Sequence, residues 1–235
     1  KRLQFRLRDL LHFHKTLASD LLRCGTPVVI NELAWSLGIT VQAAILGHIR
    51  YAAGDPVAAN SIAGIVQQLS TVFIFGIANA AAVMVGMTIG EGKQELAKKQ
   101  AHTFKYLSFL IGVLACGLIL LLKDPFINFY HIPEVTKELA RQLMVVIAFV
   151  TIFVSSSSVL IVGVLRGAGD TTFCLASEMV CLWLIATPLA FVLAHVLHAP
   201  VPLVLIGMKM DEPCKTTACL IRMRGDKWLR SLTRE

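Results

Sequence analysis

Two carboxylates stand inside otherwise apolar stretches of the sequence, Glu32 in PVVINELAWSLG and Glu178 in FCLASEMVCLWL. A carboxylate removed from water ionises less readily and is stabilised by a bound proton or cation. Glu32 is therefore predicted to hold an exchangeable proton or a monovalent cation. The alternative is that Glu32 reaches the headgroup layer of a membrane or pairs with Arg23. Glu178 is a second candidate for such a site, and equally a candidate for fastening two helices through Lys215 or Arg166.

Three uncharged residues stand where they can assist these carboxylates. Asn31 precedes Glu32, Gln67 lies in the middle of another apolar stretch, and Trp35 follows Glu32 by about one helical turn. Amide side chains in apolar helices either hydrogen-bond to neighbouring helices or line a polar path. A tryptophan beside a carboxylate either packs or forms the wall of a pocket for an aromatic or cationic compound. Asn31 and Gln67 are the predicted partners of Glu32.

The pattern of cysteines and histidines does not favour an enzyme or a metal protein. The six cysteines form no C-x-x-C pair, and the pairs His12/His14 and His195/His198 have no third ligand nearby in the sequence. No nucleophile with an adjacent base is apparent. We therefore expect no enzymatic activity, no metal site and no cofactor beyond a coupling ion.

The elements that must position these residues are apolar helices. The chain of 235 residues is 56% hydrophobic and 16% charged, and its apolar residues form blocks of about 20, the length that spans a bilayer. The sequence predicts an all-α membrane protein with six transmembrane helices, at residues 25–47, 60–89, 104–122, 142–165, 172–197 and 201–221. The last contains four charged residues between Lys209 and Lys215. It is either a span whose charged face packs on other helices, or a shorter re-entrant or interfacial helix.

Lysine and arginine positions predict the domain order and the orientation. Residues 1–23 form a predicted amphipathic cytoplasmic linker helix, residues 24–222 the six-helix transmembrane lobe, and residues 223–235 a basic cytoplasmic tail. Most basic residues fall on the side of the two ends, so both termini are predicted to be cytoplasmic in a multi-pass protein of the inner or plasma membrane. Because the basic residues flank apolar spans, membrane lipid is an expected partner and nucleic acid is not.

Two apolar stretches end on the same glycine pattern, G-x-x-x-G-x-G. VGMTIGEGKQEL contains Gly86, Gly90 and Gly92, and VGVLRGAGDTTF contains Gly163, Gly167 and Gly169. Glycines four apart allow a neighbouring backbone to approach closely, and the last glycine can end the helix with a positive φ. Arg166 is then predicted to anchor at the headgroups and Asp170 to cap the next helix. Pro188, in the middle of the fifth span, is a predicted hinge.

GVLRGAGDT resembles the signature that closes the tenth helix of multidrug and toxic compound extrusion (MATE) transporters. TPVVINELAWSLG resembles their seventh helix, WLIATPLAF their eleventh, and KMDEPCK their last. The resemblance implies twelve helices in two six-helix lobes, of which this chain matches the second lobe and the interlobe linker. It also implies exchange of H⁺ or Na⁺ for organic, often cationic, compounds by alternating access. The expected partners are a small organic substrate and either the missing N-terminal six-helix lobe or a second copy of the chain.

The resemblance assigns Glu32 to the cation-coupling and substrate site of the family, but one position departs from the family pattern. Many bacterial members carry an acidic residue in the tenth helix, whereas the matching segment here has only the hydroxyls of Ser155–Ser158. We therefore expect Glu32 to act alone or with Asn31 and Gln67.

Two other functions are compatible with the sequence. One is a flippase of a related fold for a lipid-linked precursor, which requires a cationic cavity for pyrophosphate; Arg166 is the only arginine near the interior of a span, which counts against it. The other is a non-transporting half-transporter or partner subunit, which the missing first lobe and the charged sixth segment favour.

Overall fold

The computed structural model describes residues 15–50 and 52–229, with side-chain environments from Gly25 onward except at Pro27. Every regular element in this part of the chain is helical, which confirms the predicted all-α class. The α-helices are α1 (Lys15–Gly47), α2 (Pro56–Gly90), α3 (Gln94–Asn128), α4 (Glu134–Ser158), α5 (Thr171–Met179), α6 (Thr187–Phe191), α7 (Val201–Met208) and α8 (Asp211–Arg222). Three π-helical segments, η2 (Val159–Leu165), η3 (Val180–Ala186) and η4 (Val192–Val196), continue α4, α5 and α6.

Five of the predicted spans are present as helices long and apolar enough to cross a membrane. The fifth has the predicted length, but the helices of the second, third and fourth spans are longer than the sequence predicted. α3 extends from Gln94 to Asn128, because its charged ends remain helical beyond the apolar centre. The first span is also longer, since α1 begins at Lys15 and passes without interruption into the apolar part. Residues 15–23, assigned to the linker from the sequence, therefore continue the first helix. The rest of the predicted linker, residues 1–14, lies outside the described residues.

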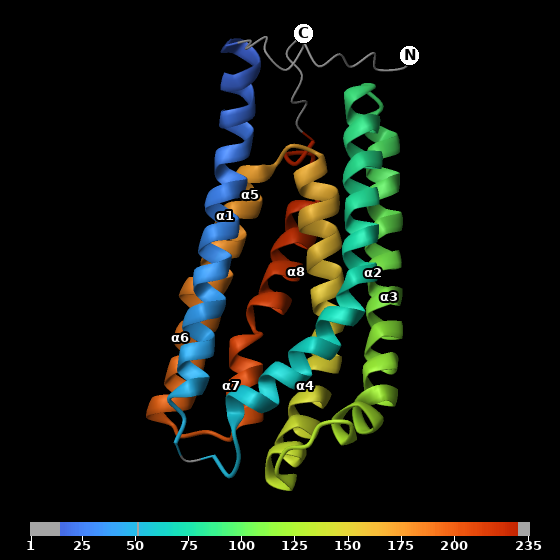
Figure 1. Ribbon diagram of the computed structural model, residues 1–235. Helices are drawn as coiled ribbons and strands as arrows, with labels where there is room; N and C mark the ends of the chain where they lie inside the picture. Colours follow the sequence, from blue (N-terminus) through green and yellow to red (C-terminus); the bar gives the residue numbers. More distant parts are fainter. Residues whose placement is uncertain (1–14, 51, 230–235) are drawn as a thin grey trace, which may run out of the picture.

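The helices form two groups with a broken helix between them (Figure 1). α1 packs with α5 and α6, whereas α2, α3 and α4 form the other group. α7 and α8 follow one another up through the space between the groups. Two hydrophobic clusters fill the bundle, one around the start of α2 with Ile62 and Val66, the other around its end with Val85 and Ile89.

The predicted sixth span is not one continuous helix. α7 ends at Met208 and α8 begins at Asp211, so residues 201–221 form two short helices rather than a single span. Gln42 of α1 donates a hydrogen bond from Nε2 to the carbonyl oxygen of Met208 at 3.2 Å, which gives a partner to a backbone group near the break. The break places the charged residues of this segment at the start of α8, where the helix dipole favours carboxylates.

The two glycine patterns end their helices in the same way. Gly92 has a φ of 75° and Gly169 a φ of 85°, in the region that favours glycine. In each case the N–H groups of the glycine and of the residue after it bond back to the last helical turn, in the pattern of a Schellman motif. The bonds from the residue after the glycine run from Lys93 N to Thr88 O at 3.1 Å and from Asp170 N to Leu165 O at 3.0 Å.

Three other glycines of these patterns, Gly86, Gly163 and Gly167, bring η2 and the residues just after it against α2. A Cβ added to Gly163 would lie 2.9 Å from the carbonyl oxygen of Ala78, and one added to Gly167 would lie 2.7 Å from the carbonyl oxygen of Ala82. Gly86 faces Gly167 from the α2 side, and a Cβ added to Gly86 would lie 3.1 Å from the carbonyl oxygen of Gly167. Backbone therefore packs directly on backbone, as in small-residue helix contacts within membranes.

Gly167→Ala is expected to lower the free energy of unfolding by about 1–3 kcal/mol, because the added methyl group must displace the α2 backbone. The matched control is Gly90→Ala, since an added Cβ there meets no atom within 4 Å. Alanine is the better helix former, so this control is expected to be neutral or to stabilise by up to about 1 kcal/mol. Thermal unfolding of the purified variants in detergent measures the difference, and equal stability of the two would contradict the close packing.

Candidate functional site: a charged cavity between the helix groups

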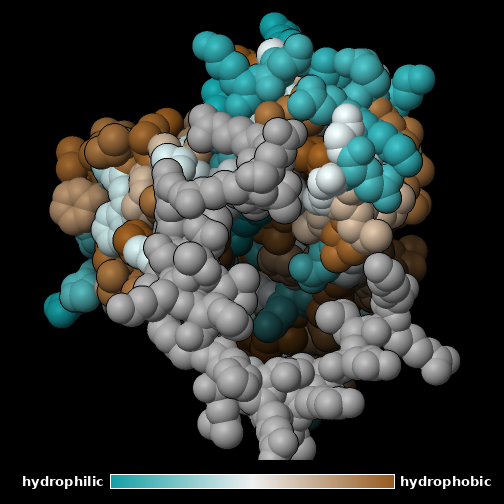
Figure 2. Space-filling view, turned by 90° about the horizontal axis from the view of Figure 1, so that it is seen from above, coloured by the Kyte–Doolittle hydropathy of each residue, from teal (hydrophilic) through white to brown (hydrophobic). Residues whose placement is uncertain are grey.

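A cavity of about 670 Å³ lies between the two helix groups. Viewed from the end where α2 finishes, the molecule is hollowed between the groups, and both hydrophilic and hydrophobic side chains are visible in the hollow (Figure 2). All five residues predicted to bind ion or substrate line this cavity, although they come from three separate helices: Asn31, Glu32, Trp35, Gln67 and Glu178. Trp35 has 44% of its surface exposed, so it forms a wall of the cavity rather than part of a packed core.

Arg166 joins the two carboxylates of the cavity. Its Nη1 lies 3.0 Å from Oε1 of Glu32, and its Nη2 lies 3.4 Å from Oε2 of Glu178. Asn31 donates a further hydrogen bond from Nδ2 to the same Glu178 oxygen. The prediction that Arg166 anchors at the headgroups is therefore wrong, since only 17% of its side chain is exposed and it points into the cavity. Two carboxylates share one guanidinium, which leaves this group, the Glu32–Arg166–Glu178 cluster, with one uncompensated negative charge.

The glycine contacts explain why an arginine closes this apolar helix. Gly163 and Gly167 stand on either side of Arg166 in the sequence, and both pack on α2. The backbone around Arg166 is therefore fixed against the α2 group, and its side chain extends across the cavity to Glu32 on α1 and Glu178 on α5. Glu178 thus pairs with Arg166, one of the two partners predicted for it if it fastens two helices. It also lines the cavity.

A second group of buried charges lines the same cavity at the break between α7 and α8. Lys215 Nζ lies 2.8 Å from both Asp211 Oδ2 and Glu212 Oε1, and Ser157 of α4 donates a hydrogen bond to Glu212. The Lys215 and Asp211 side chains are only 5% and 7% exposed. Lys209 also lines the cavity beside them. The sequence showed these charges without showing that they pair; their i,i+3 and i,i+4 spacing was the available signal.

Asp170 does not cap the next helix as predicted. It precedes α5, but its side chain makes no capping hydrogen bond. Oδ2 instead accepts a hydrogen bond from Nε of Arg222 on α8 at 2.7 Å, and Asp170 is 1% exposed. The Arg222 guanidinium also lies 5.0 Å from the ring centre of Phe173, which adds a cation–π contact. An ion pair to a distant helix replaces the local hydrogen bond because Arg222 ends α8 beside this turn.

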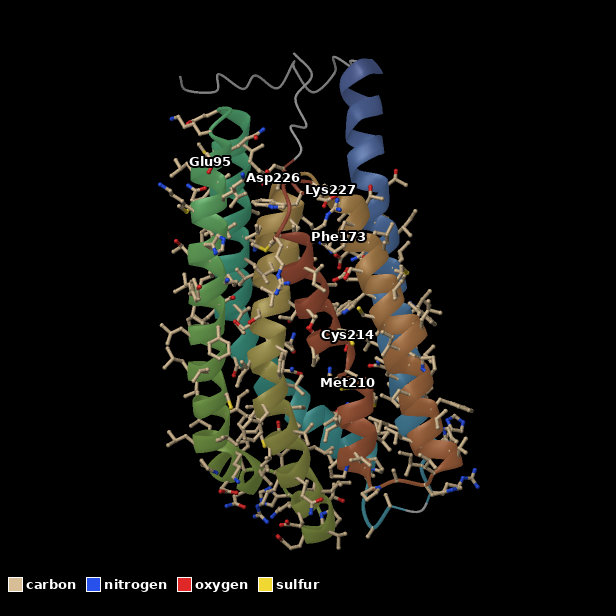
Figure 3. The ribbon with its side chains drawn as sticks, turned by 180° about the vertical axis from the view of Figure 1, so that it is seen from behind. Glu95, Phe173, Met210, Cys214, Asp226 and Lys227 are labelled. Carbon is tan, nitrogen blue, oxygen red and sulfur yellow. The ribbon has the colours of Figure 1, made fainter. Side chains whose placement is uncertain are left out.

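Part of the predicted basic tail packs on the bundle. Trp228 is 2% exposed and belongs to the hydrophobic cluster around the end of α2. Asp226 pairs with Lys98 of α3 at 2.9 Å, and Figure 3 shows Asp226, Lys227 and Phe173 at the same end of the bundle. The sequence analysis missed these contacts, although a tryptophan in an otherwise polar tail was a signal for them.

Pro188 lies away from the cavity. It stands in the first turn of α6, between the π-helical segments η3 and η4, and lines an outer hollow with His48, Phe191 and His195. Its role as a hinge stays a prediction. Among the four serines of α4, Ser155 donates to the carbonyl oxygen of Ser108 at 2.7 Å, so it fastens α4 to α3.

The fold and the cavity define this chain as one helical lobe of a membrane protein with buried charges, and comparison with known proteins gives its family. The family model MatE matches residues 27–192. The chain belongs to the MatE family, the MATE transporters, which confirms the resemblance seen in the sequence.

Relatives and solved structures agree with this assignment. The chain is 28% identical to a probable multidrug resistance protein NorM of Thermotoga maritima, a match that covers 100% of the chain and 50% of that protein. It is 27% identical to the uncharacterized transporter YisQ of Bacillus subtilis, over 97% of the chain and 50% of that protein. The chain thus spans about half the length of these relatives.

Among solved structures, an outward-facing multidrug resistance MATE family transporter of the MOP superfamily superposes with a TM-score of 0.81 at 18% identity. That match covers 94% of the chain and 48% of the solved one. The MATE transporter ClbM in complex with Rb⁺ gives a TM-score of 0.79 at 17% identity, over 92% of this chain and 50% of that one. These likenesses show that the lobe has the fold of half a MATE transporter.

Arg222→Met is expected to destabilise the chain by about 2 kcal/mol, because it removes a charge-assisted hydrogen bond to the buried carboxylate of Asp170. Arg224→Met is the matched control, since Arg224 is exposed two residues further on. Thermal unfolding in detergent compares the two. A loss of stability no larger for Arg222→Met than for the control would contradict the role given to this ion pair.

Proposed function

We propose that the protein exports organic, often cationic, compounds in exchange for H⁺ or Na⁺ by alternating access, with this chain as the C-terminal lobe. The other half of the transport path is then an N-terminal six-helix lobe or a second copy of the chain. The observation that carries the proposal is the Glu32–Arg166–Glu178 cluster, which leaves one negative charge uncompensated in a polar cavity between apolar helices.

The chemistry of the cavity suits a cation. An uncompensated carboxylate in a cavity between apolar helices is stabilised by a proton or a cation. Among the described residues, the buried Oδ1 of Asn31 has no hydrogen-bond partner, although its Nδ2 is held by Glu178. This oxygen and the Glu32 carboxylate oxygens are ligands of the kind that bind hard monovalent cations, and a carboxylate also binds a proton. The MATE transporter ClbM forms a complex with Rb⁺, which supports cation binding within the family.

The size and wall of the cavity suit an organic cation. A volume of about 670 Å³ lies within the range of pockets that hold drug-sized molecules. Trp35 stands one helical turn from Glu32 on the same wall, so a flat cation bound to the carboxylate can contact the indole face. The names of the NorM relatives, multidrug resistance proteins, support this substrate class.

In this proposal, Glu32 binds either the coupling ion or the organic cation. Loading and release shift the balance between outward-facing and inward-facing states, because a ligand moves such an equilibrium only through its different affinities for the two. The basic residues at one end of the bundle, among them Lys93, Lys98 and Arg222, support a cytoplasmic location for that end in an inner or plasma membrane.

The cavity does not favour a flippase for a pyrophosphate-linked lipid. Its cations are Arg166, Lys209 and Lys215, and two of these three are held by carboxylates at salt-bridge distance. Its four carboxylates outnumber the three cations, so its net charge opposes an anionic headgroup.

Glu32→Gln is expected to reduce gradient-driven transport of ethidium, a fluorescent organic cation, at least tenfold in proteoliposomes, because the amide cannot bind a proton or neutralise a cation. A pH gradient and a Na⁺ gradient are imposed separately, and the one that drives transport identifies the coupling ion. The matched control is Glu138→Gln, an exposed carboxylate that pairs with Arg141 outside the cavity.

Transport by the Glu32→Gln variant at the rate of the unmodified chain would contradict the proposal. Transport by the chain alone would show that a second copy completes the path. If only the chain joined to an N-terminal six-helix lobe transports, the chain acts as one half of a two-lobe transporter.

A further inference from the structure

The geometry points to Arg166 as a tethered cation that occupies the carboxylates of the cavity until a free cation replaces it at Glu32. This inference rests on the proposed function and adds how cation binding changes the contacts between the helix groups. Arg166 presents a planar organic monocation to Glu32 and Glu178. It therefore competes with any ligand of the same class for the same oxygens.

The two carboxylates differ in how open they are. The Glu32 side chain is 56% exposed and lies 3.0 Å from Arg166, whereas the Glu178 side chain is 14% exposed and also accepts a hydrogen bond from Asn31. A cation entering from the cavity reaches Glu32 first. Arg166 then stays paired with Glu178 while the entering cation pairs with Glu32. Neither charge is left isolated in the cavity.

The contact broken by this exchange joins the two helix groups. Arg166 is fixed to the α2 group by the packing of Gly163 and Gly167, while Glu32 belongs to α1 in the other group.

α1 is the least buried of the five helices that can span a membrane. In its most apolar stretch 22% of the residues are buried, against 28–50% in the other four. Other described ties of α1, such as the packing of Leu182 on Gly38 and the bond from Gln42 to Met208, hold it to its own group or to α7. Its contact with α2 lies at its far end, where Gly47 stands beside Val57. Displacing Arg166 from Glu32 therefore removes the direct ion pair between α1 and the end of η2, and leaves the indirect link through Asn31 and Glu178. Cation occupancy is in this way coupled to the position of α1.

The nearby charges do not supply an alternative partner for the displaced guanidinium. Glu212 and Asp211 of α8 also line the cavity, but both are held by Lys215 at 2.8 Å. Arg166 consequently remains close to Glu32 after displacement and returns when the cation leaves. A tethered competitor of this kind weakens cation binding without abolishing it.

The test is the affinity of ethidium for the purified chain in lipid nanodiscs, measured by fluorescence anisotropy. Arg166→Gln is expected to lower the Kd for ethidium about tenfold, because it removes the competitor and leaves the Glu32 carboxylate open. Arg166→Lys keeps the charge and is expected to bind nearly as the unmodified chain does. The matched control is Arg141→Gln, since Arg141 also bridges two carboxylates, Asp124 and Glu138, but outside the cavity. That change is expected to leave the Kd unaltered.

A folded Arg166→Gln variant that binds ethidium as the unmodified chain does, or more weakly, would overturn this inference while leaving the proposed function intact. If the unmodified chain shows no binding that depends on Glu32, both proposals fail. Hydrogen exchange on the unmodified chain gives a second measurement that needs no variant. Ethidium is expected to increase exchange in residues 28–36 of α1, and no increase on saturation would count against displacement of Arg166.

Discussion

The close contact between η2 and α2 is the constraint on which the cavity depends. Where Gly163 and Gly167 meet α2, only backbone atoms and the methyl group of Ala81 lie at the contact. This contact sets the position of the chain at Arg166, from which a long side chain crosses to the opposite helix group. A bulkier residue at either glycine would move the guanidinium away from both carboxylates, so a packing contact between apolar helices determines an electrostatic one.

Charge pairing is the second constraint, because isolated charges are costly among apolar helices. The structure meets this cost with two clusters that use different solutions. Lys215 lies between two carboxylates that follow the break in the last segment, so that cluster is local to α8 with one hydroxyl from α4. The Glu32–Arg166–Glu178 cluster instead brings Glu32 of α1 to two residues at least 134 positions further along the chain, which are only 12 residues apart from each other. Of these two clusters, the second joins the helix groups through a partly exposed carboxylate, which makes it the one suited to respond to a ligand.

The family membership and the length of the match indicate which part of a transporter this chain corresponds to. It has the fold of one half of a MATE transporter and spans about half the length of its relatives. Its cavity is nevertheless formed within the single lobe, with both acidic residues, the bridging arginine and Trp35 in place. The proposed cation binding therefore needs residues of this lobe only, whereas the proposed alternating access requires a second body against which the lobe moves.

The sequence alone determined the local features of this protein. Apolar blocks predicted five of the spans, and the glycine patterns predicted the helix ends, because both depend on residue types and spacing within one segment. An acidic residue in an apolar stretch likewise identified Glu32 as a residue that needs a partner.

Only the tertiary structure decided which partner each charge finds. An arginine at the end of an apolar helix can reach the headgroups or fold back into the bundle, and helical periodicity does not distinguish the two because the side chain is long. The structure directed Arg166 inward, paired Asp170 with Arg222, and divided the sixth segment at Lys209–Met210. These outcomes depend on helices far apart in the chain, whose relative placement is set by packing rather than by any local pattern.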